Sequence, residues 1–106
     1  MDKHTVIKAV IVDSNTTQIS FLEVCEHYAI SEDMLLELLE YGLISDISNP
    51  NRELRFNQKH LQRILSAHRL HQDLNVNTHG AILALELMDE LTELRRQMDI
   101  IRRHLG

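Results

Sequence analysis

The sequence contains a single cysteine, a single proline, three glycines and no tryptophan. One cysteine excludes a disulfide within the chain and any metal site built from several cysteines, and it fits a reducing cytoplasm. Because aromatic residues make up only 4% of the chain, a hydrophobic core has to be built mainly from Leu, Ile, Val and Met. At 106 residues the chain is long enough for one small domain with an appended helix.

Long apolar segments are also missing. The chain has no run of about 18 apolar residues, the length that a membrane-spanning helix requires. It also has no basic N-terminal segment followed by an apolar stretch, which is the pattern of a secretory leader. These two absences predict neither a membrane span nor secretion, and we expect a cytoplasmic protein.

Catalytic and metal-binding motifs are absent too. The glycines are isolated, so no phosphate-binding loop is present, and no serine stands in a nucleophile-elbow pattern. His68 and His71 are spaced for one face of a helix and could share a zinc ion if a third ligand converged on them. Surface or half-buried histidines that form hydrogen bonds with loop carbonyls explain the pattern better. We therefore expect a protein that is not an enzyme and holds no metal or cofactor.

Acidic residues are concentrated in one region of the chain. The formal net charge is −5. Residues 20–56 contain eight acids against two bases, Arg52 and Arg55, whereas residues 57–106 contain seven bases against six acids. A negative field over the first of these regions repels nucleic acid and attracts cationic proteins.

That acidic region contains the pattern of a helix-turn-helix. Ser20 and Ser31 are suitable N-caps, and they predict helices over residues 21–29 and 32–41 that are joined by a short turn and closed by Gly42. A helix that reads DNA carries Arg and Lys, because contacts with phosphates supply most of the non-specific affinity. The second helix contains four acids and no base. Its composition favours a protein partner over DNA.

The remaining elements follow from periodicity and turn residues. β-branched residues predict a strand over residues 5–12. Two short strands, residues 43–47 and 52–56, flank an Asn-Pro-Asn turn and predict a β-hairpin of the size of a wing. Asn57 caps a helix over residues 58–73, and Asn77 or Thr78 caps a last helix that extends to His104. The expected organisation is an N-terminal extension (1–18), a winged helix-turn-helix (19–76) and a long C-terminal helix (77–106).

The last helix has the most regular apolar pattern in the chain. Its apolar residues alternate steps of three and four, which is the a/d seam of a coiled coil over three heptads. A helix of this length, at about 1.5 Å per residue, extends beyond what so small a domain can cover. A second copy is the simplest partner, so we predict a homodimer, although a helix folded back on its own domain would also satisfy the pattern. The predicted interface residues are Leu87, Leu91, Leu94, Met98 and Ile101, with Ala84 and Leu105 at the two ends.

Leucines on the second helix allow two interpretations. Leu36, Leu38 and Leu39 are interleaved with Glu37 and Glu40. They form either an exposed apolar patch ringed by acid, suited to a basic amphipathic helix, or a set of side chains buried under the wing and the third helix. The sequence favours neither.

The order of these elements resembles the MerR-type winged helix-turn-helix. The second helix ends in Tyr-Gly-Leu-Ile (residues 41–44), followed by a wing, a long helix and a coiled-coil helix. In that family the second helix usually reads Leu-Arg-Tyr-Tyr before the Gly-Leu, whereas this chain reads Leu-Leu-Glu-Leu (residues 35–38). Leu36 therefore stands where the family has its DNA-contacting arginine. A dimeric MerR-like transcriptional regulator remains the alternative function that this resemblance implies.

The chain is also similar to the CbpM family of chaperone modulators over residues 18–105. The resemblance rests on Arg-Leu-His (69–71), Leu74, Gly80, Ala-Leu (84–85), Leu-Met-Asp-Glu-Leu (87–91) and Leu94, with Ile-Ser (19–20), Cys25, Ile-Ser-Glu (30–32) and Gly42 nearer the start. It implies binding to the J-domain of a CbpA-type co-chaperone, which presents a basic helix to DnaK, and inhibition of its work with DnaK. Two sets of residues are candidates for this docking. One is the acidic second helix, through Glu37 and Glu40, and the other lies near the root of the long helix. The full set of candidate partner-binding residues is Glu37, Glu40, Arg55, Arg69, Leu85, Met88 and Asp89.

Overall fold

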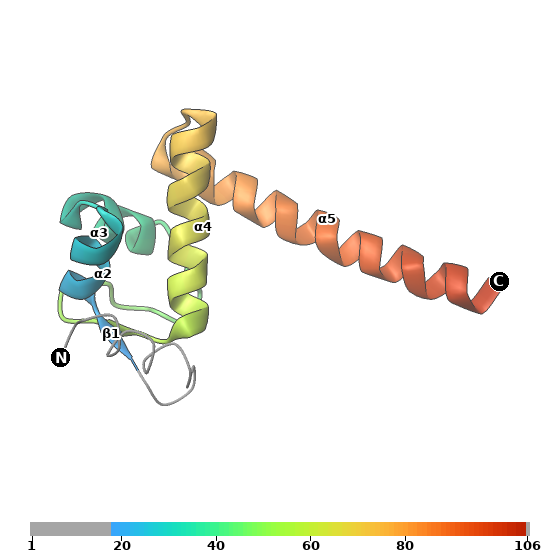
Figure 1. Ribbon diagram of the computed structural model, residues 1–106, viewed down its shortest axis with the longest axis horizontal. Coiled ribbons are helices and arrows are strands. Elements are labelled where there is room, and N and C mark those ends of the chain that lie inside the picture. The colour runs from blue at the N-terminus through green and yellow to red at the C-terminus, as the bar shows by residue number, and fades with distance from the viewer. Residues whose placement is uncertain (1–17, 106) are drawn as a thin grey trace.

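The computed structural model describes residues 18–105. These residues form a compact helical domain from which one long helix projects (Figure 1). The elements in chain order are β1 (Ile19–Ser20), α2 (Phe21–Tyr28), α3 (Glu32–Glu40), β2 (Arg55–Phe56), α4 (Gln58–Leu74) and α5 (Thr78–Leu105). The mostly α-helical fold with a small β component is confirmed, whereas the strand predicted over residues 5–12 lies outside the described residues.

Local capping explains the helix-turn-helix. The Ser20 hydroxyl accepts a hydrogen bond from the Glu23 N–H, and the Glu23 carboxylate accepts one from the Ser20 N–H, so α2 begins with a complete capping box. At its other end Ala29 adopts a left-handed conformation (φ 55°), and the Ile30 N–H donates to the Cys25 carbonyl. The Ser31 hydroxyl then accepts from the Met34 N–H and starts α3. Both helices are confirmed to within one residue.

The predicted pairing of residues 43–47 with residues 52–56 in a β-hairpin wing is wrong. Residues 43–47 form turns and not a strand: the Leu43 N–H donates to the Leu38 carbonyl, and the Ile47 N–H to the Ile44 carbonyl. The strand predicted over residues 52–56 shortens to β2, which pairs antiparallel with β1 in the register Ile19↔Phe56. Leu43 and Ile44 are buried in the core. Their apolar character reflects this burial, which the pattern cannot distinguish from a strand.

The core lies between the helix-turn-helix, β2 and α4. The Phe21 and Phe56 rings lie with centroids 6.4 Å apart, and Leu35, Leu38 and Ile64 are fully buried around them. Asn57 caps α4, and the α4 helix ends at a left-handed Asn75. The first turns of α5 close the core, with Ala81, Ile82 and Leu85 buried against the domain.

Beyond Leu85 every residue of α5 up to Leu105 is exposed. The Asn77 side chain accepts a hydrogen bond from the Gly80 N–H, which starts the helix as predicted. From there α5 leaves the domain at a steep angle to α4, and no other element of residues 18–105 lies along its outer half (Figure 1). None of the helices in residues 18–105 combines the length and apolar character needed to cross a membrane.

Candidate interaction surfaces

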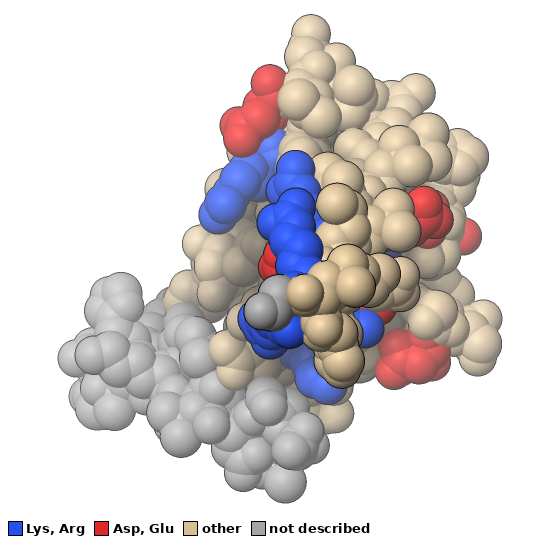
Figure 2. Space-filling model, turned by 90° about the vertical axis from the view of Figure 1, so that its right-hand side faces the viewer, with Lys and Arg blue, Asp and Glu red and all other residues tan. Residues whose placement is uncertain are grey.

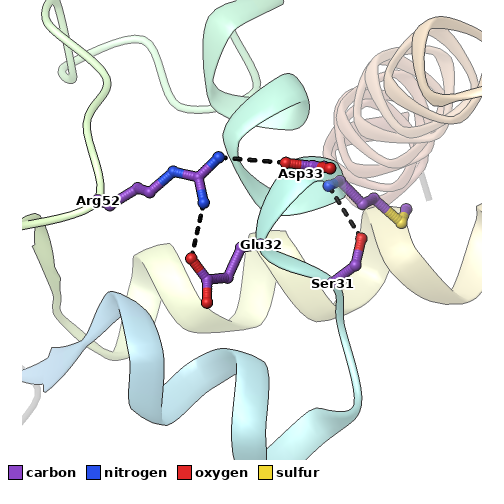
Figure 3. Close-up of polar contacts among 5 residues, drawn as sticks. Ser31, Glu32, Asp33 and Arg52 are labelled. Carbon is purple, nitrogen blue, oxygen red and sulfur yellow. Dashed lines mark hydrogen bonds and ion pairs between the residues drawn. The ribbon is translucent and has the colours of Figure 1, made fainter.

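The N-terminal carboxylates of α3 are bound within the chain. Arg52, in the loop before β2, donates from Nη1 to Glu32 Oε1 (2.7 Å) and from Nη2 to Asp33 Oδ1 (3.1 Å), as Figure 3 shows. These hydrogen bonds raise the pKa of Arg52. The arginine therefore ties the loop to the first turn of α3. Its positive charge partly neutralises Glu32 and Asp33, the carboxylates that occupy the N-terminal end of α3, where a helix favours negative charge.

The C-terminal half of α3 presents its carboxylates to solvent. Glu37 accepts a hydrogen bond from the buried hydroxyl of Thr78 (2.5 Å), and Glu40 lies exposed one turn later. We call the depression between α3, the end of α4 and the start of α5 the acidic hollow; it has a volume of about 570 Å³. It is lined by Ser31, Asp33, Met34, Leu36, Glu37, Glu40, His71 and Thr78. The hollow combines three carboxylates with two half-buried apolar side chains.

The prediction of an exposed apolar patch made by the three α3 leucines is wrong. Leu38 and Leu39 are buried, with exposed fractions of 0% and 1%, and Leu36 is partly buried against the same core. Of the two interpretations that the sequence allowed, burial describes Leu38 and Leu39, whereas Leu36 is only partly buried and lines the acidic hollow. α3 packs against both α2 and α5, so leucines on more than one of its faces are buried.

The second candidate surface surrounds Asp89. Its carboxylate accepts a hydrogen bond from Arg63 Nη1 (2.8 Å), while Arg63 Nε donates to the Leu43 carbonyl (2.7 Å). Leu85 is only 8% exposed and belongs to the core, so its side chain offers little to a partner, whereas Met88 is 51% exposed. Arg63 thus joins α4, the loop after α3 and the root of α5.

The other two cations predicted to bind a partner lie on different elements. Arg69 is exposed on α4. Arg55 is exposed in β2, where its guanidinium donates to the Gln18 carbonyl (3.5 Å). Arg55 also contributes to lowering the pKa of Glu23, after the larger effect of the Ser20 backbone hydrogen bond. The candidate residues therefore do not form one continuous patch, and they remain predictions.

Along α5 the structure leaves an apolar stripe open. The predicted interface residues from Leu87 to Ile101 have exposed fractions between 46% and 57%, Leu105 is 84% exposed, and Leu83 is 56% exposed. At about 100° per residue, this stripe lies roughly opposite Ala81 and Leu85, which face the core. The helix therefore turns its seam away from its own domain. The stripe consists of Leu83, Leu87, Leu91, Leu94, Met98, Ile101 and Leu105.

Charges on the exposed part of α5 are segregated along its length. Residues 86–93 contain four acids and no base, whereas residues 95–103 contain four arginines and one acid. Figure 2 shows basic side chains gathered in the centre of the view, with acidic ones toward the margins. Some of these charges pair along the helix, such as Arg96 with Glu93 (2.6 Å), which lowers the pKa of Glu93 to about 2. The acidic half adjoins the domain and the basic half is distal.

Several residues that shape these surfaces were not predicted to do so. Arg52 and Arg63 act through partners about 20 residues or more away, and Tyr41 stacks on His79 with ring centroids 4.7 Å apart. Such contacts join separate elements, so no local spacing signals them. The only hint was that Arg52 is one of two bases in an acidic region.

His71 and Cys25 have structural explanations, whereas the buried Nδ1 of His68 has no hydrogen-bond partner among residues 18–105. His71 Nδ1 contacts the Val76 carbonyl (2.6 Å), as expected for a histidine bonded to a loop carbonyl. Burial, with a smaller effect from His71, lowers the pKa of His68. Burial likewise raises the pKa of the Cys25 thiol, which keeps it protonated and poorly nucleophilic. Within residues 18–105 no three potential ligands converge on a metal site.

Comparisons with known proteins agree with this architecture. Residues 19–103 match the sequence profile described as MerR HTH family regulatory protein. The chain is 28% identical over 89 residues to the chaperone modulatory protein CbpM of Pseudomonas entomophila, covering 84% of this chain and 88% of that protein. It is 27% identical to CbpM of Pseudomonas putida strain GB-1 over the same shares, and 26% identical to CbpM of Salmonella paratyphi B, over 86% and 90%. These relatives are named as modulatory proteins, and the matching profile describes regulatory proteins. Because the profile covers most of the chain, from β1 to the end of α5, this chain belongs to the MerR helix-turn-helix family of regulatory proteins.

Proposed function

We propose that this chain is a non-enzymatic chaperone modulator that binds the J-domain of a CbpA-type co-chaperone and inhibits its action with DnaK. The similarity to several proteins named chaperone modulatory protein CbpM supports the chaperone-modulating role. The observation that carries the proposal is the composition of α3, which has four carboxylates and no Lys or Arg. A helix-turn-helix with this surface is suited to a cationic protein and not to phosphates.

The acidic hollow is the first candidate for the docking site. A basic helix could place its cationic side chains against Glu37 and Glu40 and its apolar side chains against Met34 and Leu36, which line the same depression. Occlusion of the partner's basic helix would be enough to inhibit it, so no chemistry is required. The surface around Met88 and Asp89 is the second candidate.

Calorimetric titration against a purified CbpA-type J-domain tests this proposal. We expect saturable binding with a 1:1 ratio of J-domain to chain, and loss of the J-domain's stimulation of DnaK ATPase activity as the chain is added. The matched control is a J-domain whose basic helix has its Lys and Arg residues replaced by Gln. Absence of heat and of co-elution at micromolar concentrations would reject the proposal.

A homodimer through α5 is part of the same proposal. The stripe on α5 is apolar, about 30 Å long at 1.5 Å per residue, and turned away from its own domain. Self-association covers the stripe with the same apolar surface of a second copy, so that apolar side chains are buried against apolar side chains. Light scattering should give twice the mass of the 12.4 kDa chain.

The alternative function is that of a dimeric DNA-binding regulator, which membership in a family of helix-turn-helix regulatory proteins favours. A gel shift with the DNA upstream of its own gene at low salt separates the two. A sequence-specific complex that is displaced by salt would support the regulator. Absence of a shift together with J-domain binding would support the modulator.

A further inference from the structure

We propose that Arg52 is an internal competitor for the acidic docking surface, and that an arginine of the partner displaces it from Glu32 and Asp33. The inference rests on the proposed function and adds a regulation of the same surface. The chain occupies part of its own acidic face with a cation of the class that the partner carries. Binding therefore requires an exchange of one guanidinium group for another.

The carboxylates of α3 lie in a row that begins at the Arg52 contact. Asp33, Glu37 and Glu40 follow one another at steps of four and three residues, which places them on one face of the helix. All three line the acidic hollow. Asp33 accepts a hydrogen bond from Arg52 (3.1 Å), whereas Glu40 is exposed. A basic helix that lies along this row therefore meets the Arg52 guanidinium at the first position.

The structure on both sides of the contact is held without it. The Ser31 hydroxyl already caps the start of α3. In the loop, the Asn51 side chain accepts a hydrogen bond from the Glu53 N–H (2.8 Å), and these two residues flank Arg52. The Leu54 carbonyl then accepts one from the first N–H of α2. The Arg52 side chain can therefore leave α3 while the backbone of the loop and of the helix stays in place.

Exposure of the contact makes the exchange easy. The side chains of Arg52, Glu32 and Asp33 are 47%, 44% and 93% exposed, so water and salt screen their attraction. The partner's cation meets the same carboxylate oxygens that Arg52 leaves. Competition therefore lowers the affinity for a basic partner without abolishing binding.

The geometry of the contact favours arginine over lysine in the partner. Arg52 Nη1 lies 2.7 Å from Glu32 Oε1, and Nη2 lies 3.1 Å from Asp33 Oδ1, so one planar group joins two carboxylates (Figure 3). A guanidinium group holds its donors in a fixed fork that can meet two acceptors at once, whereas an ammonium group is a compact point charge. A lysine of the partner therefore replaces Arg52 poorly.

Calorimetric titration of a CbpA-type J-domain into charge-matched variants tests the competition. Arg52→Gln removes the competitor, and we expect it to bind the J-domain about three- to tenfold more tightly than the parent chain. Lys59→Gln is the matched control, because it removes the same charge from an exposed residue of α4. It reports the effect of net charge alone, which should be below about twofold.

A double-mutant cycle tests whether Arg52 acts through the two carboxylates. In a background with Glu32→Gln and Asp33→Asn, the change Arg52→Gln should alter the affinity by less than about twofold, because the contested site is gone. A gain as large as in the parent background would mean that Arg52 acts through long-range charge and would overturn the inference. Circular dichroism of each variant checks that the helical content is retained.

Two measurements on the parent chain need no variant of it. The NMR signal of the Arg52 Nε–H should weaken as the J-domain is added, because the released guanidinium exchanges faster with water. A J-domain whose basic helix has its arginines replaced by lysines should bind the parent chain at least about threefold more weakly than the natural J-domain. Equal binding of the two J-domains would overturn the preference for arginine.

The outcomes separate this inference from the proposed function. If the parent chain binds the J-domain and Arg52→Gln binds it equally or more weakly, Arg52 is not a competitor, and the proposed function stands. If neither the parent chain nor any variant binds the J-domain, the proposed function fails and the inference fails with it.

Discussion

The root and the outer half of α5 contain similar apolar residues, but those of the root are buried and those of the outer half are exposed. In the root, Ala81, Ile82 and Leu85 are buried against the domain, whereas the stripe residues from Leu87 to Ile101 are about half exposed and Leu105 is 84% exposed. The buried residues and the stripe face roughly opposite sides of one helix. The difference divides α5 into a root that packs against its own domain and an outer half whose apolar stripe is exposed, which is the surface proposed for the homodimer.

Introducing a charge into the stripe is expected to have the largest effect. Leu94→Asp would place a carboxylate in the seam of each copy, and burial of an unpaired charge costs several kcal/mol. We expect the mass measured by light scattering to fall to that of one chain, while circular dichroism retains the helical content of the domain. Leu94→Met is the matched control. An unchanged mass for the Asp variant would contradict the seam.

Truncating the root should instead destabilise the domain. Leu85→Ala removes a buried side chain and is expected to lower the free energy of unfolding by about 2–4 kcal/mol in urea titrations. Leu91→Ala, made at an exposed position on the same helix, should leave the unfolding of the dissociated monomer within about 0.5 kcal/mol of the parent. Equal losses from both variants would mean that the outer half of α5 is covered by its own chain.

Charge reversal on α3 tests whether recognition belongs to the acidic hollow. Glu37→Lys combined with Glu40→Lys should weaken J-domain binding at least about tenfold by calorimetry, because attraction to a basic helix becomes repulsion. Asp89→Asn and Met88→Ala report on the second surface. If only the Asp89→Asn and Met88→Ala variants weaken binding, the docking site is the surface at the root of α5 and not the acidic hollow.

The smallest effect concerns an ion pair on the outer half of α5. The hydrogen bonds from Arg96, and then from Gln97, lower the pKa of Glu93 to about 2. The pKa of Glu93 in the folded state lies below the ordinary glutamate value. The pair therefore stabilises the helix at pH values above that ordinary pKa, and this stabilisation is lost as the pH falls toward 2. Carboxyl NMR titration should find this low midpoint. In the Arg96→Ala variant the pKa should return toward that of an exposed glutamate, with little change in stability because the pair is exposed.

Local patterns predicted the helices well. Ser20, Ser31, Asn57 and Asn77 cap helices through contacts within three residues, so the four helices begin where the sequence indicates. The 3–4 spacing likewise identified the stripe on α5, since every member lies on one helix. Interactions of this kind are complete within a few residues and can be read from spacing alone.

Contacts between elements that are distant in the sequence could not be predicted from local patterns. The pairing of β2 with β1, and the burial of Leu38, Leu39, Leu43 and Ile44, depend on how α2, α4 and α5 pack around them. A short apolar run looks the same whether it becomes a strand or fills a core.

By itself, the sequence determined the helices, their caps, the acidic character of α3 and the apolar stripe of α5, because hydrogen bonds within one turn and helical periodicity are local properties. Only the tertiary structure decided that Arg52 and Thr78 occupy part of the α3 carboxylates, that Leu85 belongs to the core, and that Tyr41 stacks on His79. The physical reason is that each of these depends on the relative placement of separate elements, which is set by the packing of the whole core.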